Sequence, residues 1–524
     1  MVKFKKIVAL GCVAGLLLSG CGKKNESANS DFKFKNYPIE TDVTLTYWSG
    51  LNTAVSTVVD NYGKTDFAQE LAKRTGVNIE YIHPATGQES TALNLMIASD
   101  QLPDLIETNW ADYSGGAEKS IQDGIIYNLN DIIDKNAPNL KKYLKQHPEI
   151  DKMIKTDDGN YYAFPFIRGD KRLLISVGTV IRNDWLEELG LQEPETIEDM
   201  ENVLKAFKEK KGAVAPLSYV PSKRDVFLGN FSTTTGYYLE NGKVTYGPLT
   251  ENYKFAVETL KRWYDEGLLD PNFVSIDDTA LTANVLNGKT GITVAAGGGG
   301  LGVWLDNMKG KDFDMTGMPF TKISDDKPIS YYKVETPYPK YGCVAITTAC
   351  KNPELAARWL DYAYGEDGDI LFNFGIEGVS FEKKDGEYVY TDIIYNNPDG
   401  LTMQQAMANY FKSSASGPFI QSKGYIDQFY YRPQQQKALD AWLLNYDTVS
   451  KNILPNISKT ADEAKEYSNI MAEITKYESK MFTNFILGTT PLSEYDSFIN
   501  KIKELNIDRA IEIQTAALER YNKR

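Results

Sequence analysis

The sequence predicts an α/β fold divided between two lobes, and three observations support this prediction. Strands and helices alternate along the chain, as they do in α/β proteins with a mainly parallel sheet. The 524 residues exceed what one hydrophobic core usually serves, so two domains are expected. The apolar fraction of 42%, with 24% charged residues, is that of a soluble globular protein.

The alternation begins with an apolar, β-rich run at residues 43–48. The stretch "FAQELAKRTG" predicts a helix that ends at Gly76, and "VNIEYI" predicts the second strand. Next come a helical pattern in "STALNLMIASD" and a strand in "DLIET". This order favours a mainly parallel sheet at the start of the fold.

The pattern restarts after "DGNYYAFPFIRG". In "RNDWLEELG", Asn183 is the expected N-cap of a helix and Gly190 its terminator. Thr196 and Asp199 are spaced as a capping box at the start of "TIEDMENVLKAFKEK". Further helices are predicted in "ENYKFAVETLKRWYDEG" and "NPELAARWLDYAYG", and from Ala461 nearly to the end, with a break at "GTTPLS".

The first residues are typical of an exported protein. Three lysines precede the apolar run 7–18, which has the length of a signal-peptide core and is short for a membrane span. The sequence Leu18-Ser19-Gly20-Cys21 then resembles the lipobox of bacterial lipoproteins, which implies cleavage before Cys21 and acylation of its thiol. The alternative is an ordinary signal peptide with an incidental cysteine. Residues 1–20 are thus a predicted lipoprotein signal peptide, and residues 21–40, polar and without periodicity, a flexible tether.

The charge limits the kinds of partner. The net charge is −14, and it becomes −17 once the three leader lysines are removed. Such a surface is a poor partner for nucleic acid or anionic lipid. Membrane attachment is therefore expected through lipid (palmitate or similar acyl chains) on Cys21, at the extracellular face of the cell membrane.

The remaining cysteines and the histidines suggest no metal site and no disulfide. Cys343 and Cys350 fall in "CVAITTAC", which is expected to be one buried strand with the two side chains on opposite faces. His83 and His147 are isolated, so a structural zinc site is not expected. No cofactor and no metal site is predicted; no D-x-D-x-D-G loop is present, although binding of a calcium ion stays open.

Several phrases together resemble the carbohydrate type of family 1 extracellular solute-binding lipoproteins, which serve bacterial ABC importers. They are "ASDQLPDLIETNW", "DGNYYAFPF", "IRNDWLEELGLQEPETIEDMENVLKAFK", "VLNGKTGITV", "CKNPELAARWLDYAYGEDG" and "FGIEGVSFEKKDGEYVYTD". The resemblance implies a two-lobed, periplasmic-binding-protein-like (type II) fold with a ligand cleft between the lobes. It also implies delivery of a sugar or oligosaccharide to the permease subunits of an ABC transporter by a monomeric protein.

The resemblance also suggests the limits of the lobes. The N-terminal lobe is expected to comprise residues 41–165 and 343–375. The C-terminal lobe is expected to comprise residues 168–340 and 378–524.

Candidate ligand-binding residues follow from the ends of predicted strands in the first lobe, where ligands of open α/β sheets bind. Sugars stack on aromatic rings and need paired donors and acceptors for their hydroxyls. Trp48 ends the first strand, and Asn109 and Trp110 follow the strand "DLIET". The alternative for Trp48 is a place in the core.

Three further candidates lie where the family's chain crosses between lobes, namely Arg168, Tyr341 and Glu377. Arg168 has the guanidinium fork suited to hydroxyls or a carboxylate, although an interlobe salt bridge is an equal alternative. The alternative for Glu377 is a carboxylate in a turn.

The second lobe contributes Ser222 and Arg224, in the loop after "APLSYV", and the run "GITVAAGGGGLGVW". Gly297, Gly299 and Gly302 match a dinucleotide fingerprint, but an extracellular protein has little access to nicotinamide cofactors. We instead expect the glycines, Gly299 in particular, to let backbone N–H groups approach a ligand beside Trp304. The alternative is a flexible turn with Trp304 in the core.

The predicted function is that of a lipid-anchored protein that captures sugar, with no catalytic residue. A neutral oligosaccharide is the default ligand, and an acidic sugar remains open. The competing function is that of a lipid-anchored extracellular hydrolase or lyase, which needs a carboxylate pair or a Tyr/Arg set that no local motif reveals. A sensor for a membrane kinase is a third possibility.

Overall fold

The structure is a computed structural model that describes residues 36–412 and 417–524. The predicted signal peptide, Cys21 and most of the predicted tether lie outside the described residues.

The first lobe is built on a four-stranded sheet with the strand order β10-β3-β1-β2. Its strands are β1 (Thr44–Trp48), β2 (Asn78–Ile82), β3 (Leu105–Thr108) and β10 (Cys343–Ile346). β1 pairs in parallel with β2 and β3, whereas β10 joins β3 in the antiparallel direction. The mainly parallel sheet predicted for the start of the fold is therefore confirmed, with one antiparallel edge strand.

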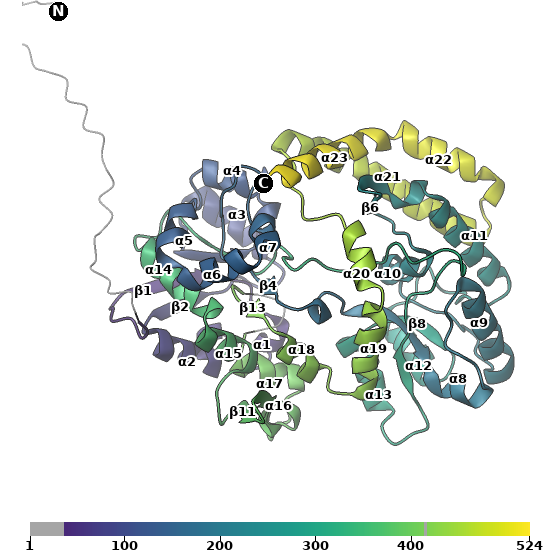
Figure 1. Cartoon of the computed structure of the whole chain (residues 1–524), viewed down its shortest axis with the longest axis horizontal. Helices are drawn as coiled ribbons and strands as arrows, with labels where there is room; N and C mark the ends of the chain where they lie inside the picture. Colours follow the sequence, from purple (N-terminus) through teal and green to yellow (C-terminus); the bar gives the residue numbers. More distant parts are fainter. Residues whose placement is uncertain (1–35, 413–416) are drawn as a thin grey trace, which may run out of the picture. The chain divides into compact units, whose positions relative to one another are not determined.

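Helices from separate parts of the chain surround this sheet, as the purple, blue and green segments of Figure 1 show. They are α1 (Thr53–Ser56), α2 (Asp66–Thr75), α3 (Glu89–Ser99), α4 (Gly116–Gln122), α5 (Asn130–Asn136), α6 (Pro138–Gln146), α7 (Pro148–Met153), α14 (Pro353–Asp361), α15 (Glu366–Phe374), α16 (Asp392–Tyr395) and α17 (Met403–Tyr410). A hairpin of β11 (Phe381–Lys384) and β12 (Glu387–Tyr390) lies against α15.

The contacts of α17 bear on where the first lobe ends. This helix packs against α1 and α2, and Gln405 Nε2 donates to Thr57 Oγ1 at 3.0 Å. The sequence predicts that residues 378–524 belong to the second lobe. From these contacts we propose instead that residues up to 412 belong to the first lobe and that the third crossing between lobes lies at residues 417–422.

The second lobe has a three-stranded sheet of order β8-β5-β9. Its strands β5 (Val177–Arg182), β8 (Ile292–Ala296) and β9 (Met315–Gly317) are all antiparallel, so the parallel arrangement does not continue after the restart. A second hairpin comprises β6 (Tyr237–Glu240) and β7 (Lys243–Tyr246). The helices are α8 (Asn183–Leu189), α9 (Ile197–Lys211), α10 (Arg224–Leu228), α11 (Glu251–Asp265), α12 (Asp278–Leu286), α13 (Val303–Asn307), α19 (Pro433–Leu443) and α20 (Tyr446–Val449).

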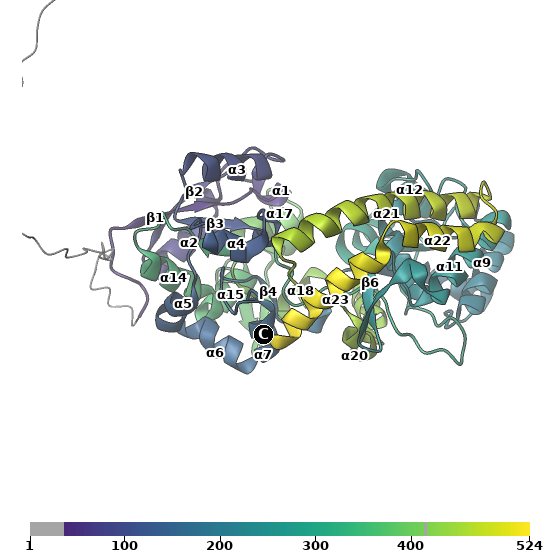
Figure 2. The same cartoon turned by 90° about the horizontal axis from the view of Figure 1, so that it is seen from above.

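Three helices at the end of the chain form a layer on the second lobe. They are α21 (Ala461–Leu487), α22 (Tyr495–Glu504) and α23 (Ile507–Lys523), which run side by side in Figure 2. α21 packs on α11, and Arg524 Nη2 beyond α23 donates to Asp157 Oδ1 in the first lobe at 2.6 Å. The layer therefore contacts both lobes.

Several local predictions have definite outcomes. α2 ends at Gly76, whose φ of 72° is the left-handed value that glycine adopts readily. The capping box of Thr196 and Asp199 is present at the start of α9. Asn183, however, is the first helical residue of α8 and not its N-cap, because the chain enters the helix through Arg182.

The predicted strand "CVAITTAC" is shorter than expected. β10 stops at Ile346, and Cys350 follows the turn at residues 348–349. Both cysteines are buried and unpaired. Among the residues that the structure describes, no helix has the length and apolar character needed to cross a membrane.

Candidate functional site

A cavity of about 440 Å³ lies between α1 and α17, beyond the carboxyl end of β1. We call it the polar cavity for its amide and hydroxyl side chains, although Ala54, Met407 and Ala408 line it too. Its size is within the range usual for small-molecule sites. The polar side chains that line it carry amides or hydroxyls: Asn52, Thr53, Thr57, Thr402, Gln404 and Gln405. Phe411, Lys412 and Tyr425 add two rings and a cation.

The local sequence explains why these side chains face the cavity. Asn52 ends the loop after β1 and accepts the N–H of Ala54 at 2.9 Å, so it caps α1. Thr402 and Gln405 form a capping box that starts α17. Gln405 also reaches Thr57, the C-cap residue of α1, so a hydrogen bond links the ends of the two helices at the cavity wall.

A row of aromatic rings leads from this cavity to the glycine run of the second lobe. It follows α18 (Lys423–Phe429), where the rings of Tyr425 and Phe429 stack with centroids 5.7 Å apart. Tyr430 comes next, 5.2 Å from Phe429. Tyr425 and Tyr430 are only 5% and 3% exposed, so most of this row packs inside the protein. The amides and hydroxyls of the cavity are the groups that can pair with sugar hydroxyls.

The glycine run 297–302 forms a single π-helical turn before α13. A Cβ on Gly297 would lie 2.7 Å from the ring of Tyr430, and one on Gly298 would lie 3.1 Å from that of Phe429. A larger residue at either position would collide with the ring of Tyr430 or Phe429, which packs on the backbone there. Glycine at these two positions is therefore explained by packing within the protein. Gly299 is exposed with open space beside it, so ligand binding there remains a prediction.

Arg168 and Tyr341, both predicted from the crossings, lie together. Arg168 belongs to β4 (Ile167–Arg168), which pairs with β13 (Ile420–Gln421) of the third crossing. Its Nη1 pairs with Glu335, and its Nη2 donates to the hydroxyl of Tyr341 at 2.6 Å. Burial raises the pKa of Tyr341, and Arg168 opposes that shift. In the described structure Arg168 is thus held by groups of two other crossing segments.

The three tryptophans of the prediction are buried. Trp110 Nε1 donates to the carbonyl of Ile106 at 3.3 Å, and Trp304 Nε1 donates to Thr282 Oγ1 at 3.1 Å. Trp48 also lies in the core cluster. These positions match the core alternative for Trp48 and Trp304, and a ligand role for any of the three stays a prediction.

The other predicted residues are spread over the two lobes. Arg224 pairs with buried Glu478, and its guanidinium lies 4.3 Å from the ring centre of Phe482. Asn109 uses its Oδ1 to cap the turn at Trp110 and its Nδ2 to reach Asp112. Ser222 and Glu377 are exposed. None of these contacts tests a ligand role.

Sequence reasoning missed most of the polar cavity. Asn52 could have been found, because a polar cap directly after the first strand lies at a sheet edge where ligands bind. Gln404, Gln405 and Tyr425 follow more than 350 positions later, and no local motif links them to the first strand.

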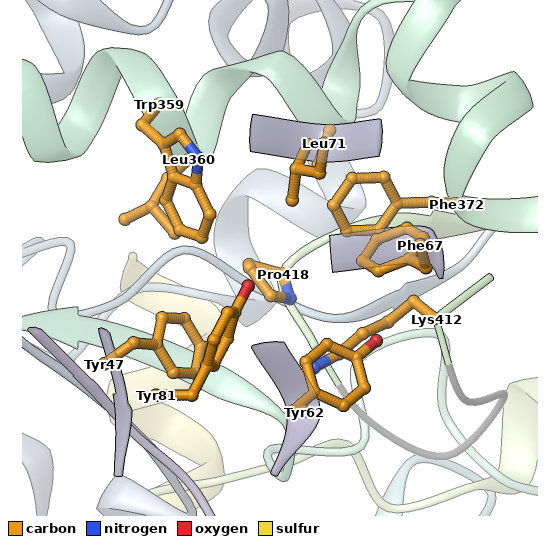
Figure 3. A pocket seen from close by; sticks show the side chains of 11 residues that line it. Tyr47, Tyr62, Phe67, Leu71, Tyr81, Trp359, Leu360, Phe372, Lys412 and Pro418 are labelled. Atoms are coloured by element: carbon orange, nitrogen blue, oxygen red, sulfur yellow. The ribbon is translucent and has the colours of Figure 1, made fainter. Parts of the chain in front are cut away.

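Lys412 also borders a second, apolar cavity (Figure 3). There its ammonium lies 4.6 Å from the ring centre of Tyr62 and is paired with Glu107 at 3.2 Å. In the described ranges 36–412 and 417–524, no cluster of three or more His, Cys, Asp or Glu side chains is placed to hold a metal ion.

Known proteins resemble the chain over two thirds of its length or more. It is 24% identical over 552 residues to the fructooligosaccharide ABC transporter substrate-binding protein FusA of Streptococcus pneumoniae, covering 99% of this chain and 98% of that one. It is 28% identical over 369 residues to the lipoprotein LipO of Bacillus subtilis, covering 67% and 70%.

A solved structure supports the fold. The HMO binding, ABC-transporter-associated solute-binding protein of Bifidobacterium longum infantis superposes with a TM-score of 0.75 at 18% identity, covering 92% of this chain and 99% of that chain. The likeness confirms the two-lobed α/β fold. The family model described as bacterial extracellular solute-binding protein matches residues 57–370, which is more than half of the chain. The chain therefore belongs to the family of bacterial extracellular solute-binding proteins.

Proposed function

We propose that this chain is a lipid-anchored substrate-binding protein that captures a sugar or oligosaccharide between its lobes and delivers it to an ABC transporter permease. The observation that carries the proposal is the cavity between α1 and α17 of the first lobe, where amides and hydroxyls line the wall and Tyr425 of α18 closes one side. Membership of the family and the similarity to a fructooligosaccharide-binding protein of an ABC transporter support the same assignment. The protein acts without changing its ligand.

Closure of the lobes follows from contacts to both of them at once. A ligand shifts a conformational equilibrium only by as much as it binds one state better. A sugar in the cavity would contact the first lobe through Asn52 and Gln404, and α18 leads from there to Gly297 and Gly298 of the second lobe, on which Tyr430 and Phe429 pack. A sugar long enough to contact both lobes favours the closed state.

Binding is tested with the mature protein in a thermal-shift screen of mono- and oligosaccharides, followed by calorimetry on each hit. The variant Gln404→Ala removes an exposed amide from the cavity and should weaken binding about tenfold, the effect of one lost hydrogen bond of about 1–1.5 kcal/mol. The matched control is Gln69→Ala, which removes an exposed glutamine from α2. Equal affinity in both variants would contradict the site.

The role of the ring is tested with Tyr425→Phe and Tyr425→Ala. The first keeps the stacked ring and should retain most of the affinity, while the second should lose it. Chromatography of the sugar after long incubation separates binding from catalysis. Unchanged sugar is expected, and cleaved sugar would favour the lipid-anchored hydrolase or lyase.

The anchor is tested separately. Full-length protein expressed in a Gram-positive host should partition into the detergent phase of Triton X-114, whereas Cys21→Ser should stay in the aqueous phase. Equal partition of the two proteins would refute acylation of Cys21.

A further inference from the structure

The polar cavity has one charged wall residue among the described residues that line it. This residue is Lys412, and the other polar groups there are neutral amides and hydroxyls. The electrostatic character of the cavity therefore depends on whether the charge of Lys412 is available to a ligand.

The surroundings of Lys412 show that its charge is already compensated. Its ammonium pairs with Glu107 Oε2 at 3.2 Å, and the two side chains are only 9% and 7% exposed. The hydroxyl of Tyr47 donates to the same carboxylate oxygen at 2.6 Å. The rings of Tyr62 and Tyr47 lie 4.6 and 5.9 Å from the ammonium (Figure 3).

The cation at the nearby crossing is paired as well. Arg168 is bound to Glu335 and to Tyr341. An anionic sugar that entered the cavity would lose its water of hydration and find, in Lys412, a cation that already has a buried carboxylate partner. Desolvation without a new ion pair is unfavourable.

We infer that the cavity selects uncharged sugars and that Glu107 sets this selectivity by neutralising Lys412. The inference rests on the proposed function and names the chemical class of its ligand. Glu107 does not line the cavity, so it is a positioning residue that acts through Lys412.

The test compares each neutral sugar that binds with the same sugar after oxidation of its primary hydroxyls to carboxylates. Affinities are measured by calorimetry on the wild-type protein and on Glu107→Gln. Wild type should bind the neutral form at least about tenfold more tightly. In Glu107→Gln the amide can still accept a hydrogen bond from Tyr47, but the charge of Lys412 is uncompensated. The oxidised sugar should therefore bind more tightly, and the preference for the neutral sugar should shrink about tenfold.

Two controls separate charge from structure. The effect in Glu107→Gln should weaken in high salt, because it is electrostatic. The double variant Glu107→Gln/Lys412→Met carries no charge at the pair and should return to the wild-type preference. If Glu107→Gln does not fold, Lys412→Met takes its place, and the remaining carboxylate should increase the preference for the neutral sugar.

The outcomes are distinct. Wild-type preference for the oxidised sugar, or an unchanged preference in the folded Glu107→Gln or Lys412→Met variant, overturns the inference while leaving sugar binding intact. Binding of neither form of any sugar overturns the proposed function itself.

Discussion

Replacing Arg224 by methionine would tell whether this residue binds ligand or holds the second lobe together. Its Nη2 lies 2.8 Å from Oε2 of Glu478, whose side chain is 2% exposed. Tyr253 donates its hydroxyl to the other oxygen of the same carboxylate, and the guanidinium covers the ring of Phe482. Arg224 thus joins α10 to α21 inside the second lobe.

The expected cost comes from the partner that is left behind. In Arg224→Met the buried Glu478 keeps Tyr253 as its hydrogen-bond donor but loses its cation. Breaking a buried ion pair in this way costs about 3–5 kcal/mol of stability. Removing both charges in Arg224→Met/Glu478→Met leaves no uncompensated ion, so most of that loss should be recovered.

The free energy of unfolding is measured by urea denaturation at pH 7, followed by far-UV circular dichroism. Two results would refute the reasoning: a loss of stability below about 1 kcal/mol in the single variant, or an equal loss in the single and double variants. Either result would mean that the uncompensated charge of Glu478 does not determine the stability. Sugar affinity is measured on the folded fraction. Unchanged affinity assigns Arg224 to structure, whereas a tenfold loss without loss of stability would make it a ligand contact.

Three more predictions concern stability, each measured as the free energy of unfolding in urea. Burial lowers the pKa of Lys340 to about 8, so between pH 8 and the ordinary pKa of 10.5 the unfolded chain binds more protons than the folded one. The stability of the wild-type protein should therefore rise with pH over this range, relative to that of Lys340→Met. Parallel plots of stability against pH for the two proteins would contradict this prediction. A Cβ on Gly178 would lie 2.4 Å from the buried indole of Trp442, so Gly178→Ala should cost about 1–3 kcal/mol, whereas Gly236→Ala, with 3.8 Å of clearance, should cost less than about 0.5. Arg524→Ala removes an ion pair that joins the helical layer to the first lobe and should cost about 1.5–3 kcal/mol; unchanged stability would show that this contact contributes nothing.

The first sheet and most helices could be predicted, because their signals are local. The box of Thr196 and Asp199 and the left-handed Gly76 each mark a helix end within a few residues. No local signal shows whether β5 pairs in the parallel or the antiparallel direction, because a short apolar strand has the same sequence pattern in both cases.

The ligand-binding residues were harder to predict, because the sequence of a strand does not show whether the side chain at its end is buried or exposed. Trp48 and Trp110 stand at strand ends, where a ring either meets a ligand or closes the core, and both are buried. Arg168 and Tyr341, each predicted at a crossing, contact one another, and their ligand role stays a prediction. The polar cavity required α1 and α17 to meet, and these helices are separated by nearly 350 residues of chain.

The buried cysteines have a practical consequence for watching the lobes move. Burial raises the pKa of Cys343 to about 12 and also raises that of Cys350, so neither thiol is reactive at neutral pH. A version truncated after Cys21 would therefore accept maleimide dyes only at thiols introduced on purpose, for example at the exposed positions Leu95 and Val214. Energy transfer between two such dyes would report the separation of the lobes in single molecules, without first replacing any native residue.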